Sequence, residues 1–115
     1  MKVKTRIVGN VLVVNVLGEL DLNTAPNFRS AIEKELGPNP DITDILLIMK
    51  DITFMDSSGL GVILGSHKRL NAYGGEIIIA APSPQVRKVF ELSGLIRVIS
   101  VYGTEDEAWA KVVGV

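Results

Sequence analysis

A continuous run of apolar residues from Ile45 to Met49, followed by a polar turn and a helical pattern, most constrains the fold of this chain. Because no polar residue alternates with the apolar ones, the run predicts a strand that is covered on both faces. Residues 50–55 are expected to connect this strand to the turn, and a helix is expected from Ser57 to about Tyr73. Its buried face is predicted to carry Leu60, Ile63, Leu64 and His67. A buried strand that leads into an amphipathic helix is typical of an α/β protein.

The turn between this strand and this helix contains more capping groups than a helix needs. Asp56, Ser57 and Ser58 each have a side chain that can accept a hydrogen bond from the free N–H groups of a first helical turn. One of them is sufficient as a cap. A simple helix start would explain the segment, but the spare hydroxyl makes it the candidate functional site.

Three glycines, Gly59, Gly61 and Gly65, fall in the first turns of the predicted helix. A glycine inside a helix costs about 1 kcal/mol relative to alanine, so these positions need a compensating gain. Gly61 and Gly65 share a helix face with Ser57. We expect them either to let the helix pack tightly on the sheet or to let another backbone approach Ser57 closely.

The remaining segments predict a mixed sheet with about four helices. Residues 3–8 and 11–17 are rich in valine and isoleucine around Gly9 and Asn10, which indicates an antiparallel hairpin at the N-terminus. Further helices are predicted at 24–36, 83–94 and 104–113, and further strands at 76–81 and 97–102. The strand at 76–81 follows a helix, so it should lie parallel to the strand at 44–49. We therefore expect a single α/β domain from residue 1 to residue 115.

The ends of two strands are expected to form one rim. In open α/β sheets, sites form beyond the carboxyl ends of the parallel strands, and Ser57 follows such an end. The loop expected from Gly18 to Asn23 also follows a strand, and Thr24 is expected to cap the next helix. Asp21 and Asn23 will share the rim with Ser57 if the two strands are neighbours.

Four motifs occur in an order that is typical of one known family. They are MDSSGLGVILG at 55–65, GELD at 18–21 followed by Thr24 and Ala25, the Gly74 and Gly75 pair, and SPQVRKVFELSGL at 83–95. Together they span most of the chain. The chain resembles the anti-sigma-factor antagonists, the bacterial branch of the STAS domain family, and is similar to the sporulation and general-stress antagonists of Bacillus.

The resemblance implies a binding module that is not an enzyme. In this family the unphosphorylated antagonist binds an anti-sigma factor and thereby frees the sigma factor. The same anti-sigma factor is an ATP-dependent serine kinase, and a phosphatase of the PP2C class restores the active form. By position in the motif the phosphate acceptor is Ser57, while physical reasoning alone leaves Ser58 as the alternative. The residues expected to bind the partner are Asp21, Asn23, Met55, Asp56, Ser57, Ser58, Gly59, Leu60 and Gly61.

A second role within the same family is also open. Related STAS domains build a sensory signalling complex, in which the same motif serves as part of a scaffold. The sequence alone does not decide between a freely switching antagonist and such a scaffold component.

Composition favours a protein as the partner. The 115 residues include 12 basic and 13 acidic ones, so there is no basic surface of the kind that nucleic acids or anionic membranes require. The absence of cysteine excludes disulfides and thiol chemistry, and one histidine without cysteine makes no typical zinc set. No apolar run has the length of a membrane span or of a signal sequence. We expect a cytoplasmic protein that needs no cofactor or metal and is a monomer when free.

A serine hydrolase is one enzyme with a serine at a strand-to-helix turn. Its motif requires a glycine two residues before the serine, where this chain has Met55. The single histidine, His67, lies on the same helix as Ser57, about 15 Å along its axis. His67 therefore cannot activate Ser57, and we expect it to be a partly buried packing residue or a surface residue.

An aspartate-phosphorylated receiver domain is another small α/β protein with an acceptor beyond a central strand. It needs clustered carboxylates that hold a magnesium ion. The candidates here are Glu19, Asp21, Asp51 and Asp56. The N-terminal hairpin argues against this fold, because a receiver domain alternates strands and helices from its start.

Overall fold

The computed structural model describes residues 1–114 and contains a five-stranded mixed sheet in the order β1-β2-β3-β4-β5. The strands are β1 (Lys2–Val8), β2 (Val11–Leu20), β3 (Asp44–Met55), β4 (Ile77–Ala80) and β5 (Ser100–Tyr102). The helices are α1 (Ala25–Leu36), α2 (Ser57–Asn71), α3 (Pro84–Ser93) and α4 (Glu105–Val113), with a short 3₁₀ turn, η1 (Leu95–Arg97). β1 pairs antiparallel with β2, and all other neighbours are parallel. The predicted α/β sheet with an N-terminal antiparallel hairpin and four helices is confirmed.

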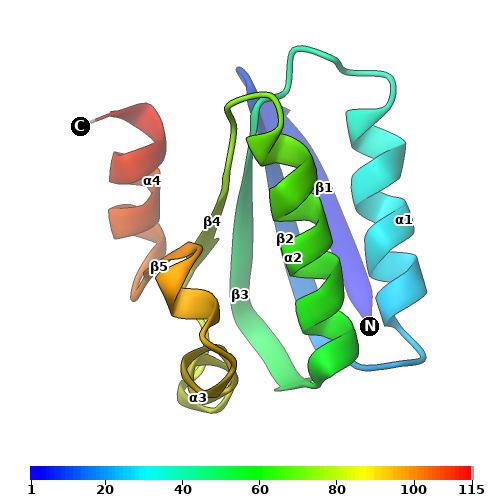
Figure 1. The fold of residues 1–115 in the computed structure, drawn as a ribbon, viewed down its shortest axis with the longest axis vertical. Coiled ribbons are helices and arrows are strands. Elements are labelled where there is room, and N and C mark those ends of the chain that lie inside the picture. The colour runs from blue at the N-terminus through cyan, green and yellow to red at the C-terminus, as the bar shows by residue number, and fades with distance from the viewer. Residues whose placement is uncertain (115) are drawn as a thin grey trace.

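Helices cover both faces of the sheet (Figure 1), and an apolar core lies on each face. α1, α2 and α3 cover the larger core, in which Phe28 and Phe90 are fully buried. α4 packs against β3, β4 and β5 on the other face and buries Ala108 there. Successive residues of the run 45–49 enter the two cores in turn, so β3 is covered on both faces as predicted.

The Thr104 side chain caps α4, as the sequence pattern indicates. Thr104 Oγ1 accepts a hydrogen bond from the Glu107 backbone N–H at 3.2 Å, and the two side chains meet at 3.1 Å. Lys50 at the middle of β3 forms an ion pair with Glu105 at 3.1 Å. The hydrogen bond to Glu105, followed by the charge of that carboxylate, raises the pKa of Lys50 above its usual value. None of the helices that the structure describes has the length and hydrophobicity of a membrane span.

β2 and β3 are both longer than the sequence pattern predicts. β2 continues to Leu20, so residues 18–20 belong to a strand and not to the expected loop. β3 continues to Met55, so residues 50–55 are strand and not a connecting segment. In this extension Glu19 pairs with Phe54 and Leu20 pairs with Met55. Pairing joins backbone groups whatever the side chains are, so the polar residues that interrupt the apolar pattern do not end the strand.

The buried face of α2 is rotated from the predicted one. The buried residues of this helix are Gly59, Val62, Ile63, His67 and Leu70. Leu64, which was expected inside, is 42% exposed, and Leu60 is only partly buried. α1 lies beside α2, and this contact covers Val62 in place of Leu64. The neighbouring helix therefore selects the buried face along with the sheet.

The last strand is shorter than expected. The backbone N–H groups of Arg97 and Val98 donate to the carbonyls of Gly94 and Leu95, which forms the 3₁₀ turn η1. β5 therefore begins only at Ser100. The prediction of a strand from residue 97 is wrong, because these local hydrogen bonds use the groups that a strand would need for pairing.

His67 is a buried packing residue, within the range of roles that the sequence leaves for it. It is 8% exposed, and its Nδ1 accepts a hydrogen bond from the Ile77 backbone N–H at 3.2 Å. Its Nε2 lies 2.7 Å from the side-chain amide of Asn71. The ring thus connects α2 to the start of β4.

Candidate functional site

β2 and β3 end side by side, and each leads into a segment that the sequence marks as functional. The backbone N–H of Asp56 donates to the carbonyl of Leu20 at 3.2 Å, which ties the two strand ends together. Asp21 follows one end and Ser57 starts α2 beyond the other. The expected juxtaposition of the two segments on one rim is confirmed (Figure 1).

Asp56 alone caps α2. Its Oδ1 accepts a hydrogen bond from the Ser58 backbone N–H at 2.8 Å, and its backbone is extended, as at a helix N-cap. Within residues 1–114, neither the Ser57 nor the Ser58 hydroxyl has a hydrogen-bond partner. Ser57 is exposed, whereas Ser58 is partly buried. The Ser57 hydroxyl is therefore free of any structural task and open to a partner.

Replacement of Asp56 by alanine is expected to lower the free energy of unfolding by about 1 kcal/mol, because the Ser58 N–H loses its acceptor. Asp56→Asn is expected to remain within a few tenths of a kcal/mol of the parent, because asparagine is an equally good cap. Urea denaturation followed by circular dichroism measures both. Equal destabilisation by the two replacements would mean that the negative charge, and not the hydrogen bond, stabilises the helix start.

The Asp21 loop is held rigidly by its own side chains. Asp21 Oδ1 accepts hydrogen bonds from the backbone N–H groups of Asn23 (2.9 Å) and Thr24 (3.1 Å). Thr24 Oγ1 accepts from the Asp21 N–H and donates to the Glu19 carbonyl, each at 2.9 Å. The prediction that the Thr24 side chain caps α1 is wrong, because its hydroxyl is already used by the residues before the helix.

Gly59 is the glycine that lets α2 pack tightly. A Cβ at this position would lie 2.7 Å from Cγ of Leu20, so only glycine lets the first turn of α2 rest on the end of β2. A Cβ at Gly61 or Gly65 would have no neighbour within 4 Å. Tight packing on the sheet therefore does not account for Gly61 and Gly65, and close approach by another backbone is the alternative that stays.

The surface around Ser57 includes two exposed apolar side chains that the sequence pattern did not single out. Leu22 in the Asp21 loop is 74% exposed, and Phe54 before the turn is 41% exposed. In the sequence, an apolar residue at position 22 within an otherwise polar loop was the signal for this exposed surface. Met55 and Gly59, by contrast, are buried, so they shape this surface from below. A rigid rim with exposed apolar groups beside a hydroxyl is suited to contact with a protein.

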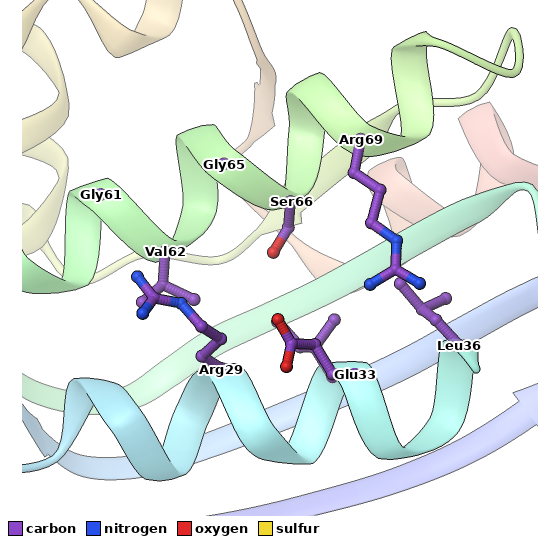
Figure 2. Close-up of a pocket in the computed structure, with 9 residues that line it drawn as sticks. Arg29, Glu33, Leu36, Gly61, Val62, Gly65, Ser66 and Arg69 are labelled. Atoms are coloured by element: carbon purple, nitrogen blue, oxygen red, sulfur yellow. The ribbon is translucent and has the colours of Figure 1, made fainter.

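A groove lies between α1 and α2 (Figure 2). It has a volume of about 200 Å³. Gly61 and Gly65 border it on α2, and Arg29 and Glu33 border it on α1. Because Ser57, Gly61 and Gly65 are four residues apart, the groove begins one helical turn from the Ser57 hydroxyl.

Comparison with known proteins identifies the family. The sequence pattern of the STAS domain matches residues 2–108. This chain belongs to the STAS domain family. The match covers both segments of the rim and all five strands. The family expected from the sequence motifs is thereby confirmed.

Relatives place this STAS domain among the anti-sigma factor antagonists. The anti-sigma F factor antagonist of Paenibacillus polymyxa is 38% identical over 98 residues, which is 85% of this chain and 83% of the relative. The unphosphorylated antagonist SpoIIAA has a TM-score of 0.84 at 34% identity, over 99% of this chain and 98% of that one. The phosphorylated form of SpoIIAA from Bacillus has a TM-score of 0.74 at 33% identity, over 96% and 99%. The STAS domain is thus a regulator of this kind and not an enzyme.

Proposed function

We propose that this STAS domain is a partner switch controlled by phosphorylation of Ser57. In the unphosphorylated form it binds an anti-sigma factor in the cytoplasm, which releases the sigma factor. The anti-sigma factor is also a serine kinase that uses ATP to phosphorylate Ser57 and so ends its own binding. A phosphatase of the PP2C class removes the phosphate and restores the antagonist.

The observation that carries this proposal is the free Ser57 hydroxyl on the rim. Asp56 provides the helix cap, so Ser57 is exposed without a structural task. A kinase must bring the acceptor hydroxyl into its own active site, which favours exposed Ser57 over partly buried Ser58. The likeness to SpoIIAA, which is known in an unphosphorylated and a phosphorylated form, supports this assignment.

The start of α2 is also a favourable place for a phosphate. The positive end of the helix dipole and the free N–H groups of the first turn stabilise an anion there. The first turn of α2 contains no acidic residue, and Asp56 at the cap is a nearby source of repulsion. Phosphorylation is therefore expected to leave the fold intact and to act on the partner.

Phosphorylation assays with the anti-sigma kinases of the same organism test the assignment. Ser57→Ala is expected to abolish phosphate incorporation, and Ser58→Ala is expected to retain at least about half of the parent rate because its hydroxyl is not the acceptor. Asp56→Asn, which keeps the cap, reports on the carboxylate separately. Loss of phosphorylation in Ser58→Ala, with normal phosphorylation of Ser57→Ala, would show that Ser58 is the acceptor. If none of the kinases binds the parent protein, the switch is wrong, and a scaffold role in a sensory complex is the function to test next.

A further inference from the structure

The groove between α1 and α2 has an apolar floor and charged walls. Ile32, Leu36 and Val62 form the floor. Figure 2 shows Arg29 and Arg69 toward its two ends, with Glu33 between them and Ser66 pointing at Glu33 from the opposite helix. The charges along the groove therefore alternate in sign, from positive to negative to positive.

These charges are not used inside the domain. The ion pairs in residues 1–114 are Lys50 with Glu105 and Arg87 with Glu91, so Arg29, Glu33 and Arg69 have no ion-pair partner there. All three are exposed. An occupant with the opposite order of charges, negative to positive to negative, would pair with each of them.

No contact within the described domain explains why the two positions beside the groove, Gly61 and Gly65, are glycine. Glycine weakens a helix relative to alanine, and Gly59 has a compensating contact with Leu20. Gly61 and Gly65 have open space where a Cβ would be, so no contact within the domain requires glycine. Their bare backbone lowers the wall of the groove on the same helix face as Ser57.

The walls of the groove decide which kind of segment fits. Both walls are helices whose backbone groups already bond within the helix, so they offer no pairing edge to an extended strand. An amphipathic helix needs only an apolar floor and complementary charges. From Gly61 to Arg69 the groove side of α2 spans about 12 Å, which accommodates about two turns of a helix.

We infer that the groove between α1 and α2 binds a helix of the anti-sigma factor, with acidic side chains opposite Arg29 and Arg69 and a basic one opposite Glu33. This inference rests on the proposed function, because it extends the Ser57 surface of the same complex. The helix covers Gly61 and Gly65 closely and places the rest of the kinase over the Ser57 hydroxyl. The groove thereby selects the cognate anti-sigma factor, while Ser57 switches the binding.

The glycine wall is tested by Gly65→Gln, with Ser30→Gln as the matched control. Ser30 is exposed on α1, on a face that does not line the groove. The probe is the anti-sigma kinase that phosphorylates the parent chain, and its Kd is measured by isothermal titration calorimetry. Gly65→Gln is expected to bind at least about tenfold more weakly but to melt at the same temperature or higher, because glutamine favours a helix more than glycine. Ser30→Gln is expected to bind like the parent, and equal affinities for the two variants would overturn the inference.

The role of the groove charges is tested by a double charge reversal. Its control is a second double charge reversal that changes the net charge of the protein by the same amount outside the groove. Arg29→Glu with Arg69→Glu is expected to weaken binding by at least about thirtyfold at low salt, and less at high salt, where charge interactions are screened. Lys34→Glu with Lys88→Glu alters the net charge equally on exposed positions outside the groove and is expected to have less than about a threefold effect. Equal losses in the two double variants would overturn the groove as the binding site.

These outcomes separate the groove from the switch. If the kinase binds and phosphorylates the parent and every groove variant alike, the groove inference is wrong and the proposed function stands. If no anti-sigma kinase binds the parent chain, both are wrong.

Discussion

Replacement of Ser57 by aspartate is expected to weaken binding of the anti-sigma factor about a thousandfold, while the domain folds and melts like the parent. The new carboxylate lies in the surface that must dock, next to Asp56. Burial of an unpaired charge, or its contact with a like charge, costs several kcal/mol, and about 4 kcal/mol corresponds to a thousandfold change in Kd. The phosphate itself carries about 1.5 to 2 negative charges, so it acts in the same direction at least as strongly.

The fold is expected to be insensitive to the same charge. The N-terminal end of a helix stabilises an anion by about 0.3 to 1 kcal/mol, which offsets the repulsion from Asp56. Ser57→Ala is expected to bind the anti-sigma factor and to resist release by ATP, because it lacks the acceptor hydroxyl. Ser30→Asp adds the same charge at an exposed position of α1 and serves as the control.

Calorimetric titration measures the predicted loss of binding, and thermal melting measures the predicted retention of stability. Amide NMR shifts on phosphorylation are expected to be confined to residues near 54–62 and to the Asp21 loop. Shifts that extend through β4, β5 and the region around Trp109 would contradict the electrostatic account and indicate a conformational switch. A Ser57→Asp variant that binds as tightly as the parent would contradict it as well.

Replacement of Gly75 by alanine is expected to give the largest loss of stability, about 3 kcal/mol or more. A Cβ at this position would lie 1.7 Å from the carbonyl oxygen of Thr43, which is backbone and cannot rotate away. Hydrogen bonds also hold the backbone at Gly75 and at the next residue in place. The Gly75 N–H donates to the Leu70 carbonyl, and the Glu76 N–H donates to Asp44 Oδ1. Relief of the clash therefore breaks the hydrogen bond from Gly75 to the end of α2 or the one from Glu76 to the start of β3.

Gly61→Ala is the control for this prediction. Its Cβ enters open space within an exposed helix, so alanine is expected to raise the free energy of unfolding by about 1 kcal/mol. Urea denaturation of both variants provides the comparison. If Gly75→Ala unfolds at the same urea concentration as the parent, the tight contact between Gly75 and Thr43 is absent in solution.

The order and type of the elements could be predicted because local rules govern them. The run at 45–49 predicts a strand buried on both faces, and Gly9 with Asn10 predicts a hairpin of the neighbouring valine-rich segments; both are observed. Ser83 and Thr104 cap α3 and α4 with their own side chains, as their sequence neighbours indicate. Such patterns depend on residues a few positions apart, so they can be read without the fold.

The motif around Ser57 was also readable from the chain, and with it the α/β class and the family. Only the tertiary structure decided how this motif is positioned relative to the rest of the domain. β2 and β3 extend to Leu20 and Met55 because the two backbones pair with each other, although polar side chains interrupt both patterns. This pairing, which joins residues far apart in the sequence, brings the Asp21 loop to the start of α2.

The division of tasks within the motif likewise depended on tertiary contacts. Asp56, Ser57 and Ser58 are equally suitable caps by sequence, and the close approach of Asp56 to Leu20 selects Asp56. Gly59 and Gly61 look alike in the chain, but only Gly59 faces the end of β2. Capping chemistry and helix propensity depend on a residue and its sequence neighbours. The exposure of a side chain depends instead on which residues from distant parts of the chain pack against it. The sequence therefore determined that spare hydroxyls exist at this turn, and the packing of α2 on β2 decided that the more exposed one belongs to Ser57.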